Sequence, residues 1–438
     1  GVEIGRRFIG TSGEIPSHDQ NADGFHEAAM PGGGIPELIQ LDQNLIKSLL
    51  QDGTNVLAVQ VHNENINSSD MSSNFWLSVG LNDNSVLYGD TPDWFSSPFF
   101  SSNLPLIFIE TLETDEIYDE PRVPAHMGIV YNGPGQVNSF SDSYNAYDGL
   151  ISIEIRGASS QLFPKKGYGF ETQNADGSNN NVSLLGMPSE NDWIFHGPFA
   201  DKSLLRNDLA YYMGRQTGRY APRTRFCELI INGDYRGVYL LTERIKRDAN
   251  RVDIAKLKPE DISGDELTGG YILQIDRDDE STEDDGWVSQ YPDYKFYAYN
   301  YPDYDDIMPE QAEYIRNYME AFEDAMDAAD YQDTYRDFVN VSSWVDYFLV
   351  TEIGKHIDAY KLSFYMHKKK ASNGGKLHFG PLWDFNLGFG NFDFSCPADP
   401  EGWSYLFGDY CSFWLPSWAK KMTDIPQVSH QINCRWDE

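Results

Sequence analysis

The feature that most constrains the fold of this chain is the dipeptide Asn232-Gly233, which separates two apolar runs. Residues 226–231 and 237–243 are rich in apolar and β-branched side chains on either side of it. Asn-Gly readily adopts the positive φ angles that a tight hairpin turn requires, so this pattern predicts an antiparallel β-hairpin. At least one sheet of the protein is therefore expected to contain antiparallel strands.

Further strands and helices are predicted from the periodicity of apolar residues. Strand patterns occupy residues 104–110, 149–156 and 270–275, and residues 373–375 (Asn-Gly-Gly) mark a second hairpin. A helix over residues 309–329 begins with Pro309, and residues 343–352 form a helix that is apolar nearly all round. Strands and hairpins precede the helices, which indicates an α+β domain in two lobes. Asp201 is expected to cap a shorter helix that carries four apolar residues on one face: Leu205, Leu209, Tyr212 and Met213.

The first part of the chain has the alternation of half-buried β-strands. Residues 55–62 and 75–79 alternate apolar and polar positions, which predicts an all-β region over residues 1–83, as in an antiparallel sandwich. Residues 50–63 resemble part of a galactose-binding-like jelly roll, a module that often serves as a spacer. Residues 84–103 are rich in Asp, Asn, Ser and Pro, so we expect them to link this partial sandwich to a large domain over residues 104–438.

One loop in the first region has the spacing of a calcium site. Asp19, Asn21 and Asp23 alternate before Gly24, as oxygen ligands do in calcium-binding loops. A full EF-hand loop requires Glu at its twelfth position, where this chain has Met30. The segment is therefore either a shorter Ca²⁺ site or a turn without metal.

The charge of the chain excludes some partners. It has 33 Lys and Arg against 68 Asp and Glu, a net charge of −35. Such a surface repels phosphate backbones and anionic lipid, so we expect no nucleic-acid partner. No apolar run approaches the roughly 18 residues of a transmembrane helix, so no membrane span is expected. Cys396 and Cys411 are candidates for a disulfide if the protein meets an oxidising compartment.

The densest polar signal flanks the second hairpin, with Asp358 before it and Asp384 after it. Two carboxylates at opposite ends of a hairpin can hold a hard cation beside a reacting hydroxyl. One would bind Mg²⁺, and the other would orient or deprotonate the nucleophile. The alternative is that both are buried aspartates that cap turns.

Five ordered motifs resemble the CotH (spore coat protein H) kinase family and favour the first alternative. They are Arg156-Gly157 with residues 163–166, residues 201–207, residues 232–239 with Glu243, residues 358–365, and Trp383-Asp384. The resemblance spans residues 104–436 and looks like a bacterial extracellular branch of the family. It implies an atypical protein-kinase-like two-lobed fold that binds ATP with Mg²⁺ or Mn²⁺ and phosphorylates Ser. It also implies a secreted protein whose protein substrate or assembly partner is extracellular or at the cell surface.

The resemblance implies roles for individual residues. Asp358 would accept the proton of the substrate hydroxyl, and Asp384 would hold Mg²⁺ against the nucleotide phosphates. Lys165 or Lys166, after the turn at Arg156, would pair with phosphate, and Glu243 would orient that lysine. Arg206 would meet either phosphate or an internal carboxylate, and we favour the internal ion pair.

Two departures from the family pattern leave the activity open. Ser363 stands five residues after Asp358, where kinase-like catalytic loops place the Asn that holds a second metal ion. Asn386 replaces one carboxylate of a frequent Trp-Asp-x-Asp motif. Both changes lower the ligand charge at the Mg²⁺ site. A catalytically weak or inactive kinase-fold scaffold of the cell surface is therefore the main alternative, and glycoside hydrolysis by paired carboxylates is the weakest one.

Overall fold

The chain divides into two compact units, Gly1–Ser96 and Ser97–Glu438. The computed structural model describes residues 101–276, 285–289, 295–391, 401–406 and 416–437, together with scattered positions between residues 2 and 59. In the first unit it describes the helix α1 (Gln43–Leu49), capped by Asp42, whose Oδ1 accepts a hydrogen bond from Asn44 N at 2.8 Å. The prediction of strands alone over residues 1–83 is therefore wrong at α1.

Several sequence-based predictions fall outside the described residues. Most of the predicted sandwich and linker lies there, and so do Asp19 of the calcium loop and the cysteines Cys396 and Cys411. The partial sandwich, the calcium site and the disulfide stay predictions. The two described cysteines, Cys227 and Cys434, carry free thiols.

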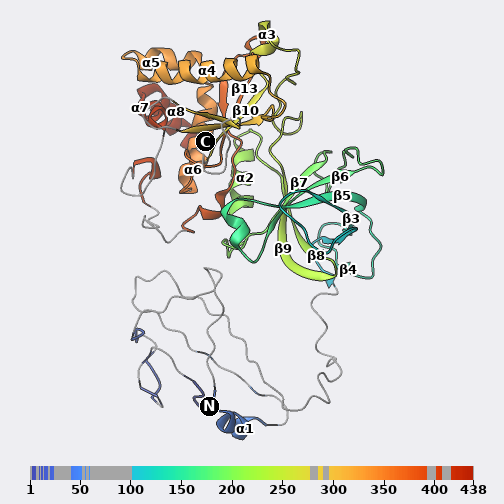
Figure 1. The fold of residues 1–438 in the computed structure, drawn as a ribbon. Helices are drawn as coiled ribbons and strands as arrows, with labels where there is room; N and C mark the ends of the chain where they lie inside the picture. The colour runs from blue at the N-terminus through green and yellow to red at the C-terminus, as the bar shows by residue number, and fades with distance from the viewer. Residues whose placement is uncertain are drawn as a thin grey trace. The chain divides into compact units, whose positions relative to one another are not determined.

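Seven strands of the second unit form a closed barrel in the order β2-β3-β5-β6-β7-β9-β8 (Figure 1). All neighbours are antiparallel except β2 and β8, whose parallel pairing closes the barrel. The core inside includes Ile107, Met127, Phe170 and Phe195. The strands are β2 (Leu106–Thr111), β3 (Val123–Val130), β5 (Tyr147–Arg156), β6 (Gly167–Gln173), β7 (Asp192–His196), β8 (Thr224–Ile231) and β9 (Asp234–Glu243), beside a short pair, β1 (Ser101–Ser102) and β4 (Asn138–Ser139).

The hairpin predicted at Asn232-Gly233 is confirmed. β8 and β9 pair antiparallel, with Ile231 opposite Asp234. Asn232 and Gly233 both have positive φ, at 51° and 73°. The Asn232 side chain also accepts a hydrogen bond from Thr111 N at 2.9 Å, which attaches the turn to the end of β2.

A second, antiparallel sheet has the order β11-β12-β10-β13-β14. Its strands are β10 (Tyr271–Asp276), β11 (Gly286–Val288), β12 (Phe296–Tyr301), β13 (Phe364–Lys368) and β14 (Leu377–Phe379). Figure 1 shows the C-terminal helices gathered beside it. They are α4 (Pro309–Asp327), α5 (Tyr331–Thr334), α6 (Val341–Ile353), α7 (Ser417–Asp424) and α8 (Pro426–Trp436). The short helix α3 (Gly264–Leu267) precedes β10. The short 3₁₀ turns are η1 (Ser159–Leu162), η2 (Tyr335–Asp337), η3 (Ala371–Asn373), η4 (Phe385–Leu387) and η5 (Ser404–Leu406).

The two long helices occur where the sequence predicts them, and they form the main core. α4 buries a stripe that includes Ile315, Phe322 and Met326, as its 3.6-residue period requires. α6 is buried almost throughout, and its Trp344 packs edge-on against Trp418 of α7 with ring centroids 5.8 Å apart. The described part of the chain is thus a mixed α+β structure. None of its helices is both long enough and apolar enough to cross a membrane.

The helix after Asp201 turns a different face inward from the one that its apolar residues suggest. In α2 (Arg206–Gln216), Leu209 and Tyr212 are exposed, whereas Ala210, Tyr211 and Gly214 are buried. A Cβ on Gly214 would lie 2.5 Å from Leu382 Cδ1, so the missing side chain lets the helix pack closely there. Tyr211 consequently points toward the segment that carries Asp384.

Candidate functional site

Asp384 lies in the segment that follows β14, in a left-handed backbone conformation with φ 58°. Its backbone N–H donates a hydrogen bond to the hydroxyl oxygen of Tyr211 at 3.2 Å. The ring of Tyr211 also stacks on Trp383, with centroids 5.9 Å apart. A non-glycine residue at positive φ costs free energy that its surroundings must offset, and such residues cluster at functional sites. α2 therefore holds Asp384 in its orientation through Tyr211.

Asp358 lies in the turns between α6 and β13. Its backbone oxygen accepts from Leu362 N at 2.9 Å, and its Oδ1 lies 3.6 Å from Lys361 Nζ. Both side chains are partly exposed, with 26% of the Asp358 and 20% of the Lys361 side chain accessible. The carboxylate can thus be reached by a substrate.

Asp358 and Asp384 belong to one electrostatic cluster. Burial, together with the negative charges of Asp358 and Asp276, raises the pKa of Asp384 to about 6, although Arg156 opposes the shift. Asp276 is the last residue of β10. Three carboxylates share this region, so a bound cation would relieve their mutual repulsion. A carboxylate oxygen is a ligand of the kind that a hard cation such as Mg²⁺ takes, together with several further ligands.

Two arginines supply positive charge beside these carboxylates. Arg156 ends β5, and its guanidinium carbon lies 5.7 Å from the centroid of the Trp383 ring. Burial and then the neighbouring charge of Arg244 lower the pKa of Arg156, while Asp384 opposes this shift. Arg244 directly follows β9 and has a half-exposed side chain 3.6 Å from Asp192. Sequence reasoning missed Arg244, because nothing in the local pattern brings the end of β9 next to the end of β5.

The two lysines predicted to bind phosphate point elsewhere. Lys165 Nζ donates to the carbonyl oxygen of Arg236 at 2.8 Å and lies 4.1 Å from the ring centroid of Tyr239. Burial lowers the pKa of Lys165 to about 8. Lys166 Nζ donates to the carbonyl oxygen of Gln161. Both amino groups therefore donate to backbone carbonyl oxygens, one in β9 and one in η1.

Glu243 is paired with arginine and not with either lysine. Its fully buried carboxylate accepts from Arg223 Nη1 at 2.9 Å and from Arg223 N at 2.9 Å, and Arg251 Nε lies 4.0 Å away. Within the described ranges no ion pair joins Glu243 to Lys165 or Lys166, and the ion pairs of Glu243 are with Arg223 and Arg251. Arg223, the residue directly before β8, is the cation that lies closer to Glu243.

Arg206 forms the internal ion pair, one of its two predicted alternatives. Its guanidinium contacts the carboxylate of Asp201, and its backbone N donates to Asp201 Oδ2 at 2.9 Å. Its Nε donates to the carbonyl oxygen of Gly388 at 3.1 Å. Arg206 thus fastens the start of α2 to the segment that follows Asp384.

The two remaining predicted metal ligands lie in the same segments as the carboxylates. Ser363 directly precedes β13 with φ 51°, and Asn386 lies in η4, where its backbone oxygen accepts from Asn391 Nδ2 at 2.7 Å. Across the described residues, no group of three or more His, Cys, Asp and Glu side chains is placed to bind a metal ion by itself. A cation held at Asp384 would therefore need oxygen ligands from a substrate or from water.

Comparison with known proteins identifies the larger part of the chain. The model of a protein family described as CotH kinase protein matches residues 153–438. Curated proteins give no match. The match begins inside β5, whereas β2 and β3 pair with strands of the matched part, so the folded barrel begins before the matched residues.

Proposed function

The chain belongs to the CotH kinase family, and on that premise we propose that it is an atypical protein kinase. Its reaction would transfer the γ-phosphate of ATP, with Mg²⁺ or Mn²⁺, to a Ser of a protein substrate. We further propose that it works outside the cell or at the cell surface, which suits its charge of −35. The barrel and the second sheet with its helices would then correspond to the two lobes of a kinase-like fold.

The observation that carries this proposal is the meeting of Asp358, Asp384 and Arg156 from three separate parts of the chain. The pKa of Asp384 responds to the charges of both other residues, after the larger effect of burial. Phosphoryl transfer requires this combination, because carboxylates are needed for the metal ion and the hydroxyl, and cations for the phosphates.

Each residue of the cluster has a role in the proposed reaction. Asp358 would accept the proton of the attacking Ser hydroxyl, and Lys361 Nζ lies 3.6 Å from its Oδ1. Asp384, with Asn386 and Ser363 as neutral neighbours, would hold Mg²⁺, which when bound neutralises phosphate charge. Arg156 and Arg244 would bind the phosphates, in place of Lys165 and Lys166.

A thermal-shift titration with MgATP tests the proposal. A ligand that binds the folded state raises the melting temperature when it saturates. We expect MgATP to stabilise the wild-type protein and Arg244→Gln to weaken apparent binding about tenfold, as loss of a charge-assisted contact does. Lys165→Met serves as the matched control and should bind nearly as the wild type does. Equal binding by Arg244→Gln, or loss of binding only in Lys165→Met, would contradict the assignment of the phosphate-binding residues.

The second candidate is a scaffold that keeps the kinase fold without phosphoryl transfer. It is favoured by Ser363 and Asn386, which are neutral, and by the pairing of Glu243 with Arg223 instead of with a lysine. A scaffold has no requirement for nucleotide, so the same titration would show no stabilisation by MgATP at any concentration. In that case the protein's role would be adhesion or assembly.

A further inference from the structure

A pocket of about 310 Å³ lies apart from the candidate site, and neither Asp358, Asp384 nor Arg156 lines it. Four elements enclose it: the loop after α2, the segment after β9, the middle of α6, and the β13–β14 hairpin with the residues that follow it. A volume of this size is at the lower end of the range for small-molecule sites. The pocket can therefore hold a small organic molecule in addition to any ligand at Asp384.

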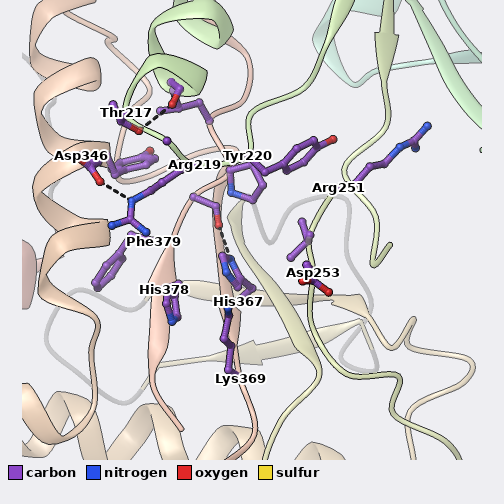
Figure 2. Close-up of a pocket in the computed structure, with 17 residues that line it drawn as sticks. Thr217, Arg219, Tyr220, Arg251, Asp253, Asp346, His367, Lys369, His378 and Phe379 are labelled. Carbon is purple, nitrogen blue, oxygen red and sulfur yellow. Dashed lines mark hydrogen bonds and ion pairs between the residues drawn. The ribbon is translucent and has the colours of Figure 1, made fainter. Parts of the chain in front are cut away.

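Two stacked histidines form part of its wall (Figure 2). His367 on β13 lies directly opposite His378 on β14, with ring centroids 5.1 Å apart and ring planes 16° from parallel. His367 Nδ1 lies 3.1 Å from the carbonyl oxygen of Gly380, so this nitrogen carries the proton. Parallel rings direct their lone pairs side by side, so they do not converge on one metal ion.

The electrostatic surroundings of these histidines are positive. Burial lowers the pKa of His378 to about 3, and the further charges that lower it are those of protonated His367, Lys369 and Arg219. Burial also lowers the pKa of His367 to about 4, and the charges of Lys369 and Arg219 add to the shift. In a chain with a net charge of −35, a pocket with this local field selects for an anion.

The carboxylates at the pocket cancel only part of this charge, because two arginines share Asp346. Asp346 is already bound by two arginines, since its Oδ2 lies 2.5 Å from Arg219 Nε and its Oδ1 lies 2.9 Å from Arg435 Nε. Asp253 is exposed and lies across the pocket from Arg219 in Figure 2. Among the described residues no carboxylate forms an ion pair with Lys369, whose side chain is half-buried. Lys369 therefore has charge available for a ligand.

We propose that this pocket binds a small phosphomonoester, with its phosphate at Arg219 and Lys369 and its organic part against Phe379, Pro381 and Leu382. Arg219 belongs to the loop after α2 and Lys369 directly follows β13, so the two cations come from different elements. That arrangement suits a tetrahedral anion better than a planar carboxylate. The organic part of the ester would pack against the apolar residues that line this side of the pocket.

The test is a titration of the full chain with glycerol 3-phosphate in phosphate-free buffer. Binding is monitored through the proton NMR signals of the histidine rings. His367→Gln and His378→Gln assign the two signals. We expect both signals to shift and saturate, with glycerol alone causing no shift. Lys369→Glu should weaken binding by about tenfold or more, as loss of a charge-assisted contact implies. Lys420→Glu, which changes an exposed lysine on α7 outside the pocket, should bind as the wild type does.

Several results would overturn the proposal. One is the absence of a shift with glycerol 3-phosphate. The others are equal affinity of Lys369→Glu and the wild type for glycerol 3-phosphate, and equal affinity of the wild type for succinate and for glycerol 3-phosphate. Equal affinity for inorganic phosphate would overturn the role given to the apolar wall. Asp384→Asn should leave the titration unchanged, so the result does not depend on whether the protein is a kinase. A melting curve of Lys369→Glu establishes that the variant is folded.

Discussion

The hydroxyl oxygen of Tyr211 accepts a hydrogen bond from the backbone N–H of Asp384 at 3.2 Å, and this contact joins helix α2 to the candidate metal-binding carboxylate. Tyr211 is 1% exposed, so no water replaces the hydroxyl easily. The backbone of Asp384 has φ 58°, a conformation that needs such support. The position of α2 and the orientation of Asp384 are therefore coupled.

Tyr211→Phe should lower the free energy of unfolding by about 1 kcal/mol, the usual cost of one lost hydrogen bond. Because Asp384 then loses its restraint, the stabilisation of the protein by MgATP should fall as well. Thermal melts with and without MgATP measure both effects. Tyr212→Phe is the matched control, since Tyr212 is the next residue on α2 and is 54% exposed. Equal behaviour of the two variants would show that the contact has no effect on the site.

Asp384→Asn should stabilise the protein at neutral pH when no metal ion is present. The carboxylate is partly buried near Asp358 and Asp276, and its raised pKa, about 6, shows that its charge is unfavourable there. Removing that charge should add about 1–2 kcal/mol to the free energy of unfolding, after allowance for partial exposure. Mg²⁺ should stabilise the wild type and not the variant. The control is Asp306→Asn at an exposed position, and a destabilised Asp384→Asn protein would count against the electrostatic account.

Acidification should destabilise the protein through His367 and His378. Their pKa values, about 4 and about 3 in the folded state, lie below the usual value, because burial and then nearby cations disfavour the charged form. Between about pH 6.5 and pH 4.5 the unfolded chain thus binds more protons than the folded chain. The free energy of unfolding therefore decreases as the pH is lowered through this range. Replacing both histidines by Gln should remove about 2 kcal/mol of this loss. Denaturant titrations at several pH values measure how the free energy of unfolding changes with pH. His430→Gln, at an exposed position, is the control. The same pH dependence in the double variant and the wild type would contradict this prediction.

Glu243 should behave as a structural residue. Its carboxylate is fully buried and binds Arg223, so Glu243→Gln should cost about 2 kcal/mol of stability. Glu260→Gln, at an exposed position 3.7 Å from Lys258, should cost almost nothing. If Glu243→Gln melted with the wild type but lost binding of MgATP, Glu243 would instead act on the nucleotide.

Local patterns predicted those parts of the fold that depend on local physics. The hairpin at Asn232-Gly233 follows from turn geometry, and α4 and α6 follow from the spacing of apolar residues. The closure of the barrel could not be predicted, because β2 and β8 are far apart in the sequence. Neither segment has a local pattern that indicates its parallel pairing with the other. The buried face of α2 was also unpredictable, since Gly214 packs against Leu382 far along the chain.

The candidate site was predictable in its carboxylates and not in its cations. Asp358 and Asp384 stand out by their place around a hairpin, and in the fold the charge of Asp358 contributes to the raised pKa of Asp384. The partners of Lys165 and Glu243 depend on tertiary packing. Lys165 donates to a backbone carbonyl oxygen, and Glu243 accepts from Arg223. Arg244 and Asp276 lie at strand ends that converge only in the folded protein.

Phosphate transfer from γ-labelled ATP is the measurement that tests the kinase assignment most directly. The wild-type protein with Mg²⁺ or Mn²⁺ should incorporate label into itself or into an added Ser-containing protein, and Asp358→Asn should lose at least about 99% of this rate, since it removes the proposed base. Asp358→Asn should still be stabilised by MgATP, because its fold and its phosphate-binding arginines remain. Transfer at the wild-type rate by Asp358→Asn, or no transfer by the wild type with either metal ion, would contradict the account.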